Sequence, residues 1–143
     1  MDIVNPKQTA DFEQPKVETT EPDVEVSSDF EIPSELQEAI ETHAKELKTK
    51  FKLRKVFAVV VAGEGENDKP YYIGYFRRPG LMPFSQYMSF VQKDVVQANK
   101  NLSQNIFLDG DRELIDDEEL FIYGLMQQIG NIVGSLDSKL VKA

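Results

Sequence analysis

The chain has 143 residues with 25 acids and 16 bases, so its formal net charge is −9. This length suits one domain of ordinary size, and the negative charge argues against general affinity for nucleic acid or an anionic membrane. The absence of cysteine excludes disulfides and thiolate metal sites, and the single histidine, His43, excludes a site with two imidazoles. No stretch is apolar enough to predict a membrane span.

Residues 1–33 have the composition of a disordered acidic tail. They contain nine acids, two lysines and four prolines, which gives them a net charge of −7. The prolines prevent long helices, and the few apolar residues bury too little surface to offset the entropy of ordering. We therefore expect a disordered tail over residues 1–33 and one small domain over residues 34–143. A tail that orders on a partner, with Phe30 and Ile32 as anchors, is the alternative.

The residues that follow Pro33 predict an amphipathic helix. Ser34 and Gln37 have the spacing of a capping box, and apolar residues from Leu36 to Leu47 recur at helical intervals. Early glutamates and late lysines also suit the helix dipole. His43 lies in this helix, and we expect it at the surface without a catalytic partner.

Two strands are predicted after this helix. Residues 53–62 centre on the β-branched run Val59 to Val61, and residues 70–77 (PYYIGYFR) alternate aromatic with other side chains. Residues 63–69 (GEGENDK) are a loop by composition, so we expect antiparallel pairing. Residues 105–112 are predicted to form a turn, and no third strand is evident.

Two further helices complete the predicted fold. The first has Pro83 in its first turn and apolar residues at helical spacing as far as Leu102, and the second runs from Asp116 towards Ser135. The predicted fold class is therefore α+β: an antiparallel β-hairpin, or a small sheet, covered by about three helices.

The last predicted helix carries an apolar stripe wider than a small sheet needs. We expect the stripe to bind a protein partner or a second copy of the chain. Its residues are Ile122, Met126, Ile129, Val133, Leu136 and Leu140. Gly124, Gly130 and Gly134 lie in the same helix; they either accommodate the domain's own strands and the helix end or belong to the docking face.

No catalytic, cofactor-binding or metal-binding residues are predicted. The acidic run over residues 109–119 (DGDRELIDDEE) lacks the ligand order of a calcium loop, and a helix N-terminus explains its charge more simply. Neither a phosphate-binding glycine loop nor a dinucleotide fingerprint is present. We therefore expect a protein that is not an enzyme.

One basic group could face an anion. It combines the cationic residues before the first strand with the two arginines at the end of the second. Its members are Lys52, Arg54, Lys55, Arg77 and Arg78. Nearby tyrosines would suit nucleic-acid binding, although contact with the acidic tail or with solvent is the better interpretation.

Short motifs in the second half of the chain resemble those of a known group. The predicted strand ending in Phe76-Arg77-Arg78-Pro79 leads into a helix over residues 85–97, and residues 105–111 (NIFLDGD) precede an acid-capped helix. In these motifs, residues 54–136 resemble the small proteins of tailed-phage and prophage structural-gene clusters, the tail-assembly-chaperone-like group. The acidic tail, the first helix and the Pro79-Gly80 step depart from that pattern.

The resemblance implies a non-enzymatic morphogenesis protein in the cytoplasm of a bacterial host. Its implied partner is an apolar helical client such as a tape-measure protein. A minor structural protein of the virion, associated with the capsid or the connector, is the alternative. A nucleic-acid-binding module that uses the basic group is a third interpretation.

Overall fold

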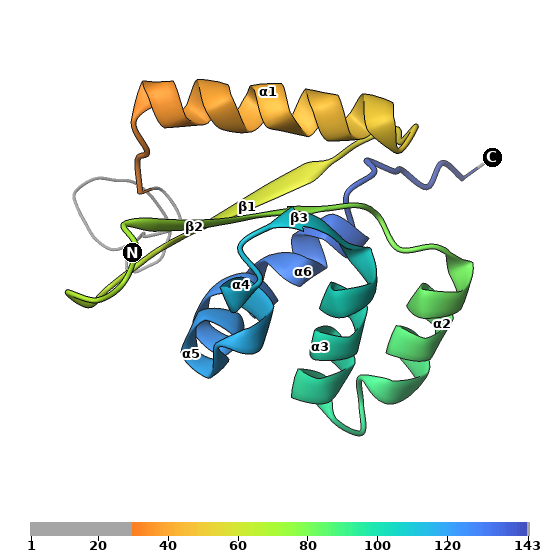
Figure 1. Cartoon of the computed structure of the whole chain (residues 1–143). Helices are drawn as coiled ribbons and strands as arrows, with labels where there is room; N and C mark the ends of the chain where they lie inside the picture. Colours follow the sequence, from red (N-terminus) through yellow and green to blue (C-terminus); the bar gives the residue numbers. More distant parts are fainter. Residues whose placement is uncertain (1–29, 143) are drawn as a thin grey trace, which may run out of the picture. The chain divides into compact units, whose positions relative to one another are not determined.

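A computed structural model describes residues 30–142 (Figure 1). The chain divides into two units between Gln37 and Glu38, a few residues later than the boundary expected from composition. The predicted tail lies outside the described residues except for residues 30–33, so its disorder stays a prediction. Helix α1 (Ser34–Lys50) begins within one residue of the predicted start, with Ser34 as its first residue and the Gln37 N–H bonded to the Pro33 carbonyl at 3.0 Å. Its part from Glu38 onward belongs to the unit that contains the sheet.

The sheet has three antiparallel strands in the order β1-β2-β3. Strands β1 (Phe57–Ala62) and β2 (Tyr71–Phe76) form the predicted hairpin, with Val59 opposite Gly74. Strand β3 (Phe107–Gly110) pairs with the other edge of β2. The α+β prediction, with a small sheet as one of its two forms, is confirmed.

Strand β3 corrects the prediction of a simple turn over residues 105–112. Its Asp-Gly end is a turn signal, but Gly110 has a φ of 116° and continues the pairing with β2. A side chain at Gly110 would overlap the carbonyl oxygen of Ile73. The next residue, Asp111, donates its N–H to that same oxygen at 2.8 Å. A strand this short is defined by its partner more than by its own sequence.

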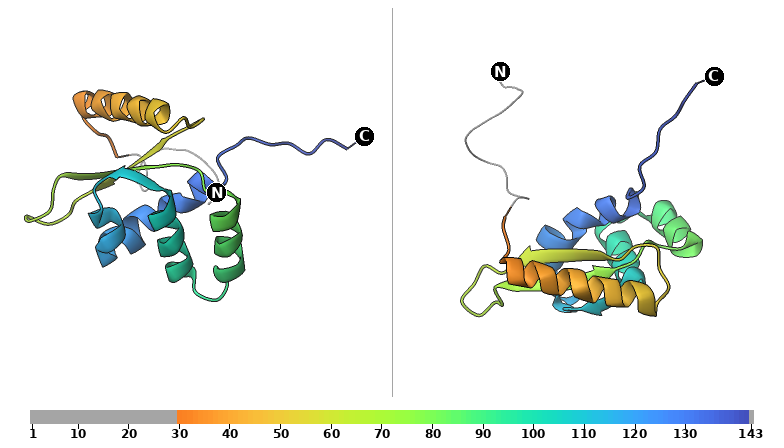
Figure 2. Two further views of the ribbon diagram at one scale, coloured as in Figure 1. Left: turned by 45° about the vertical axis from the view of Figure 1, so that its right-hand side comes forward. Right: turned by 90° about the horizontal axis from the view of Figure 1, so that it is seen from above.

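The two faces of the sheet are covered by different helices (Figures 1 and 2). Side chains alternate along a strand, so Val59, Tyr72 and Phe76 point into the main core while Tyr75 points to the face that α1 covers. The main core is completed from the helices after β2. Its fully buried helical residues include Ile106, Leu114, Ile115, Leu125 and Ile129.

The helices after β2 are more numerous than expected. The predicted helix from Pro83 to Leu102 is two helices, α2 (Leu81–Phe90) and α3 (Val95–Ile106). Asp94 separates them because its carboxylate caps α3, accepting the Gln97 N–H at 3.0 Å. No helix within residues 30–142 combines the length and apolar character needed to cross a bilayer.

The predicted last helix is also divided. Short helices α4 (Glu113–Asp116) and α5 (Glu118–Leu120) lead into a π-helical turn, η2 (Phe121–Leu125), and α6 (Met126–Val133). Asp117 caps α5 by accepting the N–H groups of Glu119 and Leu120, both at 3.0 Å. The acidic run thus supplies a helix cap, but at Asp117 and not at the predicted start, Asp116, which is the last residue of α4.

Two glycine substitutions test how tightly β3 is held. Gly110→Ala should lower the free energy of unfolding by about 1–3 kcal/mol, because alanine at a positive φ is strained and its Cβ meets Ile73. Gly130→Ala is the matched control: it lies in α6 with no atom within 4 Å of the added Cβ, so it should stabilise by about 0.5–1 kcal/mol. Urea unfolding of both variants measures the change in the free energy of unfolding. Equal changes for the two variants would show that Gly110 is not constrained by its positive φ and by Ile73.

Candidate protein-binding site

The apolar stripe predicted on the last helix is divided between the core and the surface. Ile129 is fully buried, and Ile122, Met126 and Val133 pack against the same core with partial exposure. Leu136 and Leu140 lie beyond the end of α6 and are 69% and 86% exposed. The stripe is therefore not one surface: its helical part faces the domain's own sheet and helices, and partner binding by the stripe stays a prediction.

Two of the three glycines in this region have a structural role. A Cβ on Gly124 would lie 2.9 Å from a methyl group of Val61, so this glycine lets η2 approach β1. Gly134 ends α6 and donates its N–H to the Gly130 carbonyl at 2.9 Å. These two glycines match the interpretation that they accommodate the domain's own strand and the helix end. Gly130 has open space around it and meets neither description.

Helix α2 is the most exposed apolar element of the described chain. Leu81, Met82 and Met88 are 80%, 69% and 54% exposed, and no residue of α2 is buried. The helix begins after Gly80, and Pro83 sits in its first turn as predicted, where no N–H is needed within the helix. A helix of a soluble domain ordinarily buries one apolar face. Helix α2 therefore presents apolar surface that its own domain leaves uncovered.

A groove runs between α2 and α3, which lie side by side and project from the sheet (Figures 1 and 2). Its volume is about 380 Å³. The lining contains apolar and amide side chains but no charged residue; it includes Tyr87, Phe90, Leu102, Gln86, Asn101 and Asn105. Apolar walls with a few amides suit an uncharged segment of another protein. The predicted helix had Pro83 in its first turn, and Leu81 and Met82, which precede this proline, were not predicted to be part of an apolar surface.

The predicted anion-facing group is only partly brought together. The Lys55 ammonium and the Arg78 guanidinium both lie over the Phe57 ring, 5.6 and 5.4 Å from its centroid. Arg78 also donates to the hydroxyl of Ser135 at 2.6 Å and to its carbonyl at 3.4 Å. Lys52 and Arg54 are exposed before β1. Arg78 thus has a structural role, in holding the segment after α6, and anion binding by the group stays a prediction.

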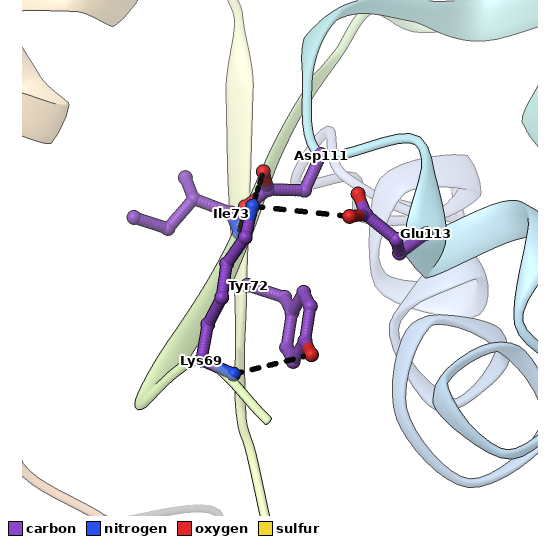
Figure 3. Close-up of polar contacts among 5 residues, drawn as sticks. All are labelled: Lys69, Tyr72, Ile73, Asp111 and Glu113. Carbon is purple, nitrogen blue, oxygen red and sulfur yellow. Dashed lines mark hydrogen bonds and ion pairs between the residues drawn. The ribbon is translucent and has the colours of Figure 1, made fainter. Parts of the chain in front are cut away.

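Asp111 connects β2 to the start of the acidic run (Figure 3). Its carboxylate accepts the Ile73 N–H at 2.8 Å and the Lys69 ammonium at 2.7 Å. Lys69 also lies 3.9 Å from a carboxylate oxygen of Glu113 and donates its backbone N–H to the Tyr72 hydroxyl at 3.2 Å. The hydrogen bond to Asp111 raises the pKa of Lys69. Within residues 30–142 no group of three or more potential ligands could hold a metal ion, and Asp111 serves instead to hold the sheet.

His43 makes side-chain contacts that the sequence did not indicate. Its Nε2 donates to a carboxylate oxygen of Asp109 at 2.7 Å, and its ring packs edge-on against Tyr75 at 4.7 Å. The Asp109 hydrogen bond raises the pKa of His43, and the same bond lowers the pKa of Asp109. Glu46 lies 3.4 Å from Nδ1. The His43–Asp109 hydrogen bond therefore ties α1 to β3.

The His43–Asp109 pair predicts a defined pH dependence. A raised His43 pKa stabilises the fold below its unfolded value of ~6.5, and this contribution is lost as pH rises through the folded pKa. A lowered Asp109 pKa contributes above ~3.9 and is lost as pH falls through the folded value. Asp109→Asn should therefore destabilise most near pH ~5.5, by at most about 1 kcal/mol for so exposed a pair, and least near pH ~8.5.

Urea unfolding at these two pH values checks this prediction. Asp137→Asn is the matched control, because Asp137 is exposed and the substitution removes the same charge at a residue that does not act on the pKa of His43. An equal loss for Asp109→Asn at both pH values would show that the pair does not titrate as described.

Comparison with known proteins identifies no family for this chain. No family model matches it, and no match was found among curated proteins or solved structures. Its function is therefore inferred from its own residues.

Proposed function

We propose that this chain is a non-enzymatic morphogenesis protein of a tailed phage or prophage, similar to tail assembly chaperones, that binds an apolar helical client such as a tape-measure protein. The observation that carries the proposal is helix α2, whose residues are all at least partly exposed although most of them are apolar. Contiguous apolar surface of this kind on a soluble domain marks a protein-binding site.

The chemistry of the surface supports a helical client. Methionine side chains are flexible and polarisable, so Met82 and Met88 can adapt to partners of different shape. The groove beside α2 has room for apolar side chains and offers amides but no charge. A helix can lay its apolar face into such a groove, with anchor residues one turn apart.

The charge of the whole chain supports the same function. A protein that exposes apolar surface to capture a client must itself stay in solution, and a net charge well away from zero achieves this. The chain carries −9 overall. Binding of this kind also needs no catalytic group.

Charge substitution on α2 tests the proposal. The full chain is co-expressed with the tape-measure protein of the phage or prophage that encodes it, and complex formation is measured by co-purification and titration. Leu81→Glu and Met82→Glu should each weaken binding at least about ten-fold, because a buried, unpaired carboxylate costs more than 1.4 kcal/mol. Both side chains are exposed in the free protein, so circular dichroism and thermal unfolding should be unchanged.

Two further variants make the result specific. Tyr123→Glu is the matched control, since Tyr123 is about as exposed as Leu81 but lies in η2; its binding should equal that of the unmodified chain. Leu140→Glu tests the exposed end of the predicted stripe. If Leu140→Glu abolishes binding while the α2 variants do not, the client binds the segment after α6. If the unmodified chain does not bind the client, the proposed function is wrong.

A further inference from the structure

Strand β1 lies at an edge of the sheet, and its backbone groups alternate between β2 and the outside. The Gly63 N–H donates to the Pro70 carbonyl at 3.0 Å, in continuation of the β1–β2 register. Bonded pairs recur at every second residue of an antiparallel ladder, so Phe57, Val59 and Val61 bond towards β2. The N–H and C=O groups of Ala58, Val60 and Ala62 therefore point outward, and the described chain supplies no partner for them.

This edge lacks the features that normally prevent pairing with another strand. Natural edges carry lysine, proline, bulges or inward-pointing charges. Strand β1 reads FAVVVA, without a charge or a proline, and its register with β2 is regular along all six residues. Ala58 and Ala62 are exposed and small, so another backbone can approach closely. The edge is thus suited to accept a further strand.

The charges on either side of β1 indicate which strand fits. The residues before it are basic, Lys52, Arg54 and Lys55, and those in the loop after it are acidic, Glu64, Glu66 and Asp68. All six are exposed. A strand that runs antiparallel to β1 and carries the same sequence would bring the basic side of one chain to the acidic side of the other. A second copy of β1 has this sequence and can run antiparallel to the first.

We propose that two copies of the chain pair through β1, antiparallel about a two-fold axis at Val60. Val60 then faces Val60 of the other copy, and Ala58 faces Ala62. Each of the three bonded pairs exchanges two hydrogen bonds, about six in total. The two three-stranded sheets become one continuous sheet of six strands. This register brings the segment before β1 of one copy, which carries Arg54, beside the loop after β1 of the other copy, which carries Glu66.

A pocket at the end of β1 provides a second complementary contact. Its volume is about 350 Å³, and it lies between the end of β1 and the α5–η2 region. Four of its lining residues are acids: Glu64, Asp68, Asp117 and Glu119. In the proposed register the segment before β1 of the second copy, which carries Lys55, lies at the end of β1 that borders this pocket. An ammonium group there would offset the repulsion among the four carboxylates. Self-pairing goes beyond client binding by α2, and neither depends on the other.

Sedimentation of the full chain tests the pairing directly. We expect a monomer–dimer equilibrium in the micromolar range. Val60→Pro should raise the dissociation constant at least about ten-fold, because it removes both central donors. The fold should tolerate this change, since the Val60 N–H is not used in the β1–β2 ladder and proline is accepted at such edge positions. Val60→Lys, which places two like charges at the axis, should have the same effect, and circular dichroism confirms that both variants are folded.

Disulfide trapping tests the register, because the chain contains no cysteine of its own. Val60→Cys should form a covalent dimer, since directly opposite residues are ~5.5 Å apart at Cα, within disulfide reach. Ala58→Cys is the matched control: its two copies would be four residues apart along the strand, ~13 Å. It should not cross-link with itself but should cross-link when mixed with Ala62→Cys.

A charge exchange separates self-pairing from binding to another strand. Arg54→Glu alone should weaken the dimer, and Arg54→Glu combined with Glu66→Arg should restore it. Lys93→Glu changes the charge by the same amount at an exposed position in the α2–α3 connection and should have no effect. A chain that stays monomeric at ~100 µM, well above a micromolar dissociation constant, would overturn the proposal, as would equal cross-linking of Val60→Cys and Ala58→Cys. Either result would leave β1 available to a different extended peptide.

Discussion

Strand β2 is the constraint on which the rest of the domain depends. Its alternate backbone groups bond to β1 on one side and to β3 on the other, and its alternate side chains face the main core and α1. A shift of one residue would exchange these two faces and move Phe76, which is fully buried in the main core, to the face that α1 covers. The register is fixed at Ile73, whose N–H and C=O are both bonded to Asp111.

The same arrangement makes the two edges of the sheet different. Strand β3 has four residues and is followed at once by Asp111 and α4, so little of its outer edge continues. Strand β1 has six regularly paired residues, and its side chains on the core face meet η2. Packing satisfies the apolar side chains of β1 but leaves every second backbone group without a partner in the described chain. Short edge strands commonly protect a sheet against unwanted pairing. Here the β3 edge is short, and the β1 edge is not.

Helix α2 is exposed for a related reason. The core below the sheet is filled by side chains from α3, α4, η2 and α6. Helix α2 packs chiefly against α3, so only Tyr87 among its residues joins the main core from the side. Its leucine and methionine side chains are not part of that core. The domain thus has a packed interior and, separately, an apolar surface that the interior does not include, and the proposed client binding rests on this surface.

The sequence by itself determined the elements with strong local signals. Helix α1 followed from its capping box and apolar period, and the β1–β2 hairpin followed from two β-rich runs joined by a polar loop. Tertiary structure alone decided that residues 107–110 form a strand, because an Asp-Gly end reads as a turn until β2 pairs with it. It also decided which apolar residues are buried. Ile129 and Leu136 have the same helical spacing in the sequence, yet one lies in the core and the other beyond the end of α6. Periodicity shows that a face is apolar, but only packing shows whether the domain's own elements cover it.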